Sequence, residues 1–180
     1  MYGVVNKAIQ ELVTENFGSQ AWEKVKSRSN VDVNSFLSNE QYSDDVTFKL
    51  AIAASEELNL PLRDVLLAFG EFWVLSTGKK HYGSLMESGG SSFKDFILNL
   101  PNFHSRVMLY YSNIVPPEFK IDQISESEIQ LHYFSIRTGL TDFMEGLILG
   151  LAKMFDTKVQ VSLIQQKGPE HDHDIFKIIL

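Results

Sequence analysis

The stretch IQLHYFSIR at residues 129–137 decides the fold class, because its apolar and polar side chains alternate as they do in a half-buried strand. Residues 119–121 show the same alternation, so the two segments predict a pair of antiparallel strands. The pattern returns at residues 159–163 and 175–179, on either side of the turn Gly168-Pro169, and predicts a closing hairpin. A four-stranded antiparallel sheet is therefore expected in the last third of the chain.

The residues before this region are predicted to be helical. Apolar side chains recur there at three- and four-residue spacing, and a further helix is predicted between the two strand pairs, over residues 139–154. Ser43 is a plausible N-cap, and Ser88-Gly89-Gly90 precede a long helix expected over about residues 92–112. The predicted order along the chain is several helices, two strands, one helix and two strands. This order predicts an α+β fold in a single domain.

The composition excludes several classes of function. The chain has 23 acidic and 16 basic residues, a formal net charge of −7, and so acidic a chain is not expected to bind nucleic acid. Cysteine is absent, which excludes disulfides, thiolate nucleophiles and cysteine-bound zinc or iron–sulfur sites. No secretory signal and no membrane-spanning run is visible, so a cytoplasmic protein is expected.

Tyr133, Ser135 and Arg137, spaced two apart, form what we call the Tyr-x-Ser-x-Arg motif. In a continuous strand these three side chains would lie on one face. Two hydroxyls and a guanidinium suit an anion with several oxygens, such as a pair of carboxylates or a phosphate. An ordinary strand with its polar side chains in solvent is an equally simple interpretation.

His104 lies on the apolar face of the long predicted helix. A lone histidine in that position is most often a core residue whose ring nitrogens are hydrogen-bonded. A buried neutral histidine also binds metals, and haem combines an iron with two propionates. His104 and the Tyr-x-Ser-x-Arg motif together are therefore consistent with a haem site.

Six short segments together resemble the H-NOX (haem nitric oxide/oxygen binding) family. Beyond the Tyr-x-Ser-x-Arg motif, the similarity lies in Met1–Asn6, Tyr42–Asp45, Ala68–Trp73, Asn99–His104 and Pro116-Pro117. It extends over essentially the whole chain, and the family's haem domain also occurs in the beta subunit of soluble guanylate cyclase. The resemblance implies one haem-binding domain over residues 1–180. Haem would lie between a helical distal part (about 1–62) and a part with the haem-ligating helix and the sheet (about 63–180).

The resemblance also implies a role for each matching residue. His104 would be the proximal ligand of the iron of haem b, and the motif would bind the propionates, with Asp45 expected to pair with Arg137. Pro117 would press on the porphyrin from the proximal side. The distal side, where the gas binds, would be lined by Val4, Val5, Phe72, Trp73, Phe143 and Leu147.

The expected gas ligand depends on a residue that is missing. Oxygen-binding members of the family carry a distal tyrosine in the helix after the motif, and residues 138–144 contain none. Without that donor the site should favour NO and CO over oxygen, because bound oxygen is the more polar ligand. Thr141 and the indole of Trp73 are the remaining candidate donors.

The function expected from the resemblance is gas sensing without catalysis. NO bound opposite His104 would weaken the iron–His104 bond and release the long helix, and a separate partner would detect the shift. In a stand-alone bacterial member, that partner would be a histidine kinase or a cyclic-di-GMP enzyme. Two alternatives are a haem protein for gas storage or electron transfer, and an enzyme that uses His104 and Arg137 on an anionic substrate.

Other suggestive residues are interpreted as structural. His171–Asp174 offers metal-ligating side chains, but a polar turn is favoured because no third ligand cluster is evident. His132 is expected to be structural or exposed, and His81 is expected in a loop. The glycine pair Gly146-x-x-x-Gly150 is expected to allow close packing against another helix or the haem.

Overall fold

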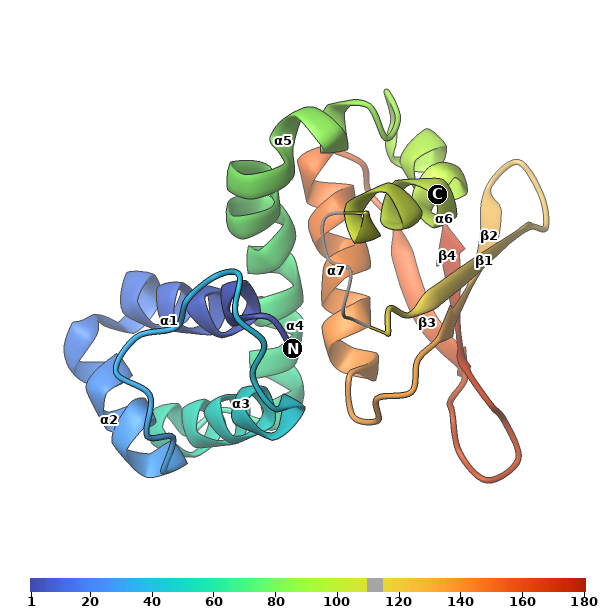
Figure 1. The fold of residues 1–180 in the computed structure, drawn as a ribbon. Helices are drawn as coiled ribbons and strands as arrows, with labels where there is room; N and C mark the ends of the chain where they lie inside the picture. Colours follow the sequence, from blue (N-terminus) through green and yellow to red (C-terminus); the bar gives the residue numbers. More distant parts are fainter. Residues whose placement is uncertain (110–114) are drawn as a thin grey trace.

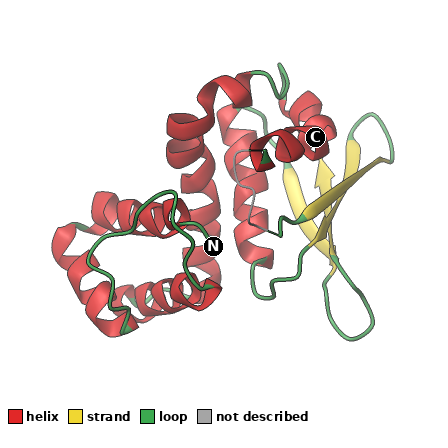
Figure 2. Ribbon diagram, in the orientation of Figure 1, coloured by secondary structure: helices red, strands yellow, loops and turns green. Residues whose placement is uncertain are grey.

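Two helices that lie side by side, α4 (Leu62–Phe72) and α7 (Thr141–Met154), form the centre of the fold (Figure 1). The structure is a computed structural model that describes residues 1–109 and 115–180. Three helices lie on one side of this pair and an antiparallel sheet lies on the other (Figure 2). The predicted α+β fold is confirmed, with helices first and a four-stranded sheet afterwards.

The remaining elements follow in the predicted order. The first three helices are α1 (Gly3–Phe17), α2 (Ser19–Ser29) and α3 (Asp44–Leu58). After α4 come a π-helix, η1 (Trp73–Gly78), and the helices α5 (Lys79–Glu87) and α6 (Phe93–Met108). The strands are β1 (Glu118–Gln123), β2 (Glu128–Phe134), β3 (Gln160–Gln165) and β4 (Asp174–Ile179).

Side-chain caps begin two of the helices. The Ser43 hydroxyl accepts the backbone N–H of Asp45 at 3.3 Å, which confirms Ser43 as the cap of α3. Ser92 caps α6 in the same way, through the N–H of Asp95 at 3.1 Å. The helix predicted over residues 92–112 is thus confirmed as far as Met108, and residues 110–112 lie outside the described residues.

His81 lies in a helix, so the loop predicted for it is wrong. The π-helix η1 carries the chain past Gly78 without a break, and α5 begins directly at Lys79. Within α5 only Tyr82 departs from helical backbone angles, with φ −131° and ψ 17°. The three polar residues 79–81 resemble a loop in sequence because this helix presents them to solvent.

The sheet has the strand order β1-β2-β4-β3, and every neighbouring pair is antiparallel. One face of the sheet is buried against α6 and α7, and the alternating residues Ile129, Leu131 and Tyr133 point into it from β2. Phe176 and Ile178 do the same from β4. The alternation that predicted these strands therefore reflects a sheet with a single buried face.

Most of the buried apolar side chains of residues 1–109 and 115–180 form two clusters. The helical cluster joins α1, α2, α3 and α4 and contains Ile9, Leu50 and Phe69, whereas the sheet cluster joins α6, α7 and the strands. Trp73 packs against both clusters. The chain from α4 into η1 is therefore the apolar connection between the helical part and the sheet.

Glycines bring α4 and α7 into backbone contact. A Cβ atom added at Gly70 of α4 would collide with the carbonyl oxygen of Phe143, and one added at Gly146 of α7 would collide with that of Leu67. Gly150 is also tight, because its Cβ would lie 3.0 Å from the Cα of Glu71. The Gly146-x-x-x-Gly150 pair thus serves close helix packing, one of the two roles expected of it.

Replacing Gly146 by alanine should destabilise the chain by about 1–3 kcal/mol, because the new methyl group meets backbone that has no room to move. Gly83→Ala is the matched control, since nothing lies within 4 Å of the Cβ position at that helical glycine. The control should be neutral or stabilising by about 0.5–1 kcal/mol. Urea unfolding of both variants measures the difference, and equal midpoints would contradict the close contact.

Candidate functional site

His104 lies near the end of α6, on the helix face that also carries the buried Ile97 and Leu100. Its imidazole meets the ring of Phe119 edge-on, with the ring centroids 5.0 Å apart. Among the described residues neither ring nitrogen has a hydrogen-bond partner. Burial lowers the pKa of His104 to about 4, and the ring is therefore neutral at pH 7, as a metal ligand must be.

Phe119 connects His104 with the Tyr-x-Ser-x-Arg motif. Phe119 and Tyr133 are register partners on β1 and β2, and their rings stack with centroids 5.7 Å apart. The row of rings His104, Phe119 and Tyr133 therefore runs from α6 across two strands. Burial raises the pKa of Tyr133, so its hydroxyl keeps the proton and can donate it in a hydrogen bond.

The Tyr-x-Ser-x-Arg motif is not one continuous strand. β2 ends at Phe134, and the Ser135 hydroxyl accepts the backbone N–H of Arg137 at 3.1 Å. A hydroxyl that binds nearby backbone competes with the strand ladder, and the chain turns here. The expectation of one continuous strand therefore holds only as far as Phe134, but Tyr133, Ser135 and Arg137 still line one small pocket together.

Arg137 ties this turn to the helical part of the chain. Its Nε donates to Oδ2 of Asp44 at 2.7 Å, and its Nη1 donates to the Val115 carbonyl at 3.1 Å. The ammonium of Met1 donates to the other Asp44 oxygen at 2.6 Å. Burial by itself would raise the pKa of Asp44, but the hydrogen bonds and charges of the ammonium and Arg137 outweigh it and lower the pKa. Asp44 therefore stays ionised between two cations.

Asp45, the expected partner of Arg137, is the wrong residue. It forms an ion pair with Lys49 at 2.7 Å, one turn along the surface of α3. Consecutive helix residues point about 100° apart, so only one of two adjacent aspartates can face the motif. A sequence motif that contains both aspartates does not indicate which one faces inward.

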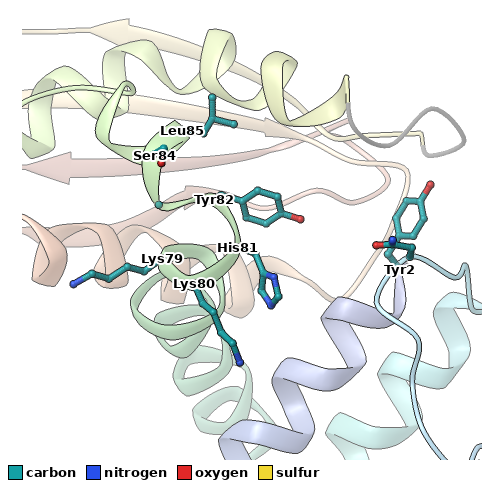
Figure 3. A pocket seen from close by; sticks show the side chains of 9 residues that line it. Tyr2, Lys79, Lys80, His81, Tyr82, Ser84 and Leu85 are labelled. Carbon is teal, nitrogen blue, oxygen red and sulfur yellow. The ribbon is translucent and has the colours of Figure 1, made fainter.

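A pocket of about 720 Å³ opens between the N-terminal end of the chain and α5. Tyr2 and Asn39 line one side and residues 79–85 line the other, and Figure 3 shows the Tyr82 ring pointing toward Tyr2. The volume is in the range of cofactor sites. None of the residues predicted to contact haem belongs to this lining. Tyr82 could not be singled out from the sequence, because the surrounding residues resemble an exposed loop.

The predicted distal residues lie in four elements: Val4 and Val5 in α1, Phe72 at the end of α4, Trp73 at the start of η1, and Phe143 and Leu147 in α7. Phe143 packs on Phe69 with centroids 4.7 Å apart, and Leu147 packs against the sheet cluster. Val5 packs against the helical cluster, Val4 is buried, and Phe72 and Trp73 are partly buried. Pro117 is partly buried immediately before β1. Contact of these seven residues with haem or gas stays a prediction.

Thr141 does not supply a distal donor. Its single O–H donates to Oδ2 of Asp174 at 2.8 Å, and a hydroxyl has one proton to donate. Asp174 is itself buried at the start of β4. The hydroxyl of Thr141 is therefore engaged with the sheet rather than free for a bound gas.

Two of the other histidines, His132 and His173, contact each other. Nδ1 of His132 lies 2.9 Å from Nε2 of His173, and Nδ1 of His173 lies 2.6 Å from the Asp172 carboxylate. Residues 1–109 and 115–180 contain no group of three or more His, Asp or Glu side chains placed to hold a metal ion. In the same residues no helix has the length and apolar character needed to cross a membrane.

Comparison with known proteins places these observations in one family. The family model described as "Haem-NO-binding" matches residues 2–163. Soluble guanylate cyclase gcy-33 of Caenorhabditis elegans is 31% identical over 171 residues, which cover 93% of this chain and 18% of that protein. Soluble guanylate cyclase gcy-35 of the same organism is 25% identical over 189 residues, with 99% of this chain and 27% of that protein covered. The chain therefore spans only about a fifth to a quarter of such relatives.

Solved structures share the fold. An H-NOX protein from S. oneidensis in the Fe(II)NO state superposes with a TM-score of 0.87 at 23% identity, over 99% of this chain and 98% of the other. An H-NOX domain from Shewanella oneidensis in the Fe(II)CO state gives a TM-score of 0.88 at 23% identity, over 100% and 98%. At this identity the likeness establishes the common fold.

The low pKa of His104 predicts a specific loss of stability in acid. The unfolded imidazole takes up its proton near pH 6.5, but the folded ring does so only near pH 4. The contribution to stability is therefore complete above pH 6.5 and declines as the pH falls from 6.5 through about 4. In haem-free protein, His104→Gln should flatten this part of the curve of unfolding free energy against pH. An unchanged slope in the variant would contradict the burial of a neutral ring.

The contact between Asp44 and Arg137 predicts unequal effects of two neighbouring substitutions. Asp44→Asn should lower the free energy of unfolding by about 1 kcal/mol, because it weakens contacts with two cations. Asp45→Asn should cost at most about 0.5 kcal/mol, because its pair with Lys49 is exposed. Both side chains lie in the first turn of α3, so the helix dipole affects them alike. Urea unfolding at low salt measures the difference, and the reverse order would refute the assignment.

Proposed function

This chain belongs to the haem-NO-binding family, and we propose that it is a gas sensor that binds NO at the ferrous iron of haem b. The observation that carries the proposal is His104, a neutral imidazole whose ring nitrogens have no hydrogen-bond partner among the described residues. A neutral imidazole whose nitrogens are not engaged by other side chains can offer a lone pair to a metal. Haem iron would accept that nitrogen and provide the coordination position for a diatomic gas.

The residues of this chain fit the two ends of a haem. His104 would hold the iron from α6, while Tyr133 and Ser135 would offer hydroxyls to the propionates. Within the described residues Arg137 uses only Nε and Nη1, which leaves Nη2 for a carboxylate. Pro117, two residues before Phe119, would lie against the proximal side.

The surroundings favour NO and CO over oxygen. The proposed distal lining is apolar except for the indole N–H of Trp73, α7 contains no tyrosine, and the hydroxyl of Thr141 is engaged with Asp174. Oxygen loses most from the missing donor, because its bound form is the most polar of the three gases. The H-NOX relatives with NO and CO on ferrous iron support the same choice of ligands for this chain.

The packing suggests how a change at His104 would reach the surface. α6 carries His104 and packs on the sheet cluster, so release of the imidazole would free α6 to shift against β1. Arg137 ties the turn after β2 to α3, and α4 with α7 ties the two clusters together. Two arrangements of α6 are enough for signalling, provided that a partner binds one better than the other. We propose that these residues bind a gas and signal without catalysing a reaction. We propose a histidine kinase or a cyclic-di-GMP enzyme as the partner.

Absorption spectra of the ferrous protein test the proposal. With NO we expect a five-coordinate nitrosyl species, which reports that His104 has left the iron. In air we expect no stable oxygen complex, because α7 offers no tyrosine and the hydroxyl of Thr141 is engaged with Asp174. A lasting oxygenated spectrum would refute the choice of gas. Two protein ligands on the iron with fast redox cycling would instead favour electron transfer.

A pair of histidine variants controls for the ligand. His104→Gly should take up ferrous haem only when imidazole is added, since a small ligand can then replace the missing ring. His171→Gly removes a histidine from an exposed turn and should behave as the parent chain does. Normal haem uptake by His104→Gly without imidazole would show that another residue ligates the iron.

A further inference from the structure

Polar contacts gather at the base of the β3–β4 hairpin, next to the Tyr-x-Ser-x-Arg motif. Asp174 opens β4 and is the register partner of Tyr133, and Lys167 follows the end of β3. A pocket of about 60 Å³ lies between them, lined from one side by the three motif residues and from the other by Lys167 and Asp174. The base of the hairpin thus lies next to the turn after β2 that carries Ser135 and Arg137, the proposed propionate ligands.

Asp174 is a buried carboxylate with a partner for each oxygen. Its side chain is 3% exposed, Oδ1 accepts the backbone N–H of Lys167 at 2.6 Å, and Oδ2 accepts the hydroxyl of Thr141 at 2.8 Å. Burying a carboxylate is costly unless hydrogen bonds compensate for lost water. Here the two bonds hold the hairpin base and the first turn of α7 against the strand that carries Tyr133.

Lys167 reaches the turn of the motif itself. Its ammonium donates to the backbone carbonyl of Ser135, while the Ser135 hydroxyl accepts the N–H of Arg137. The ammonium also brings positive charge to a pocket that Ser135 and Arg137 line. The backbone that follows the Ser135 side chain is therefore held at the Ser135 carbonyl and at the Arg137 N–H by hydrogen bonds outside the strand ladder.

We infer that Lys167 and Asp174 are positioning residues for the propionate-binding turn. Asp174 fixes the hairpin base, and Lys167 holds the Ser135 carbonyl so that the Ser135 hydroxyl and the Arg137 guanidinium face one anion. The inference rests on the proposed haem function and adds two residues outside the motif. The inference also gives a role to a buried carboxylate that lies beside a proposed site for carboxylates. Asp174 binds the hairpin backbone, whereas Arg137 forms its ion pair with Asp44.

Loss of haem from Lys167→Met to excess apomyoglobin tests the inference in the full chain. We expect loss about tenfold faster than from the parent, the effect of one charge-assisted hydrogen bond. Lys167→Arg keeps the charge and should restore most of the retention. The same measurement with iron protoporphyrin dimethyl ester should show no difference between parent and variant, because the ester has no carboxylate to position.

Further variants separate positioning from general loosening. Lys158→Met removes an exposed lysine before β3 and should lose haem at the parent rate. Asp174→Asn should speed haem loss in the same direction as Lys167→Met, since it weakens the acceptor for the Lys167 N–H. Equal acceleration for haem and its ester would mean that Lys167 only stabilises the fold, which overturns the inference.

Two further outcomes distinguish a failure of the inference from a failure of the proposed function. A parent chain that holds haem together with an unaffected Lys167→Met would overturn the inference and leave the proposed function intact. A parent chain that takes up no haem would overturn both.

Discussion

The rest of the structure depends on how closely α4 and α7 approach each other. Gly70 and Gly146 stand where any side chain would meet the backbone of the opposite helix. This contact joins the helical cluster to the sheet cluster, and Trp73 packs against both. Because protein interiors are close-packed, the distance between these helices also sets where Phe143 and Leu147 lie. The proposed distal side is therefore shaped by two glycines that lie outside its proposed lining.

Hydrogen bonds and charges assemble the polar end of the site on this frame. Asp44 joins the end of the chain at Met1 to Arg137, and Lys167 and Asp174 hold the turn that precedes Arg137. The aromatic row through Phe119 brings His104 to the same strands. Residues from α3, α6, β2 and the β3–β4 hairpin thus meet at one place. This convergence accounts for a site that is distributed over more than a hundred residues of sequence.

Several features of this site could be predicted from sequence, and the others had physical reasons to be missed. The alternation at residues 129–133 predicted β2 because one face of the sheet is buried, but the strand ends where the Ser135 hydroxyl binds the backbone. The sequence does not distinguish Asp44 from Asp45 as the partner of Arg137. Only the orientation of α3 about its own axis decides which of the two faces Arg137. Residues 79–85 carry no apolar periodicity, so neither their helix nor their pocket was predicted.

The sequence by itself determined the α+β order of elements, the apolar helix face with His104, and the motif that indicates an anion, because local periodicity records which face of each element is buried. Only the tertiary structure decided that Asp44 pairs with Arg137, that Thr141 is engaged with Asp174, and that Lys167 reaches Ser135. Each of these contacts joins residues at least 32 positions apart. Such contacts depend on the packing of whole helices and strands, which no local pattern in the chain records.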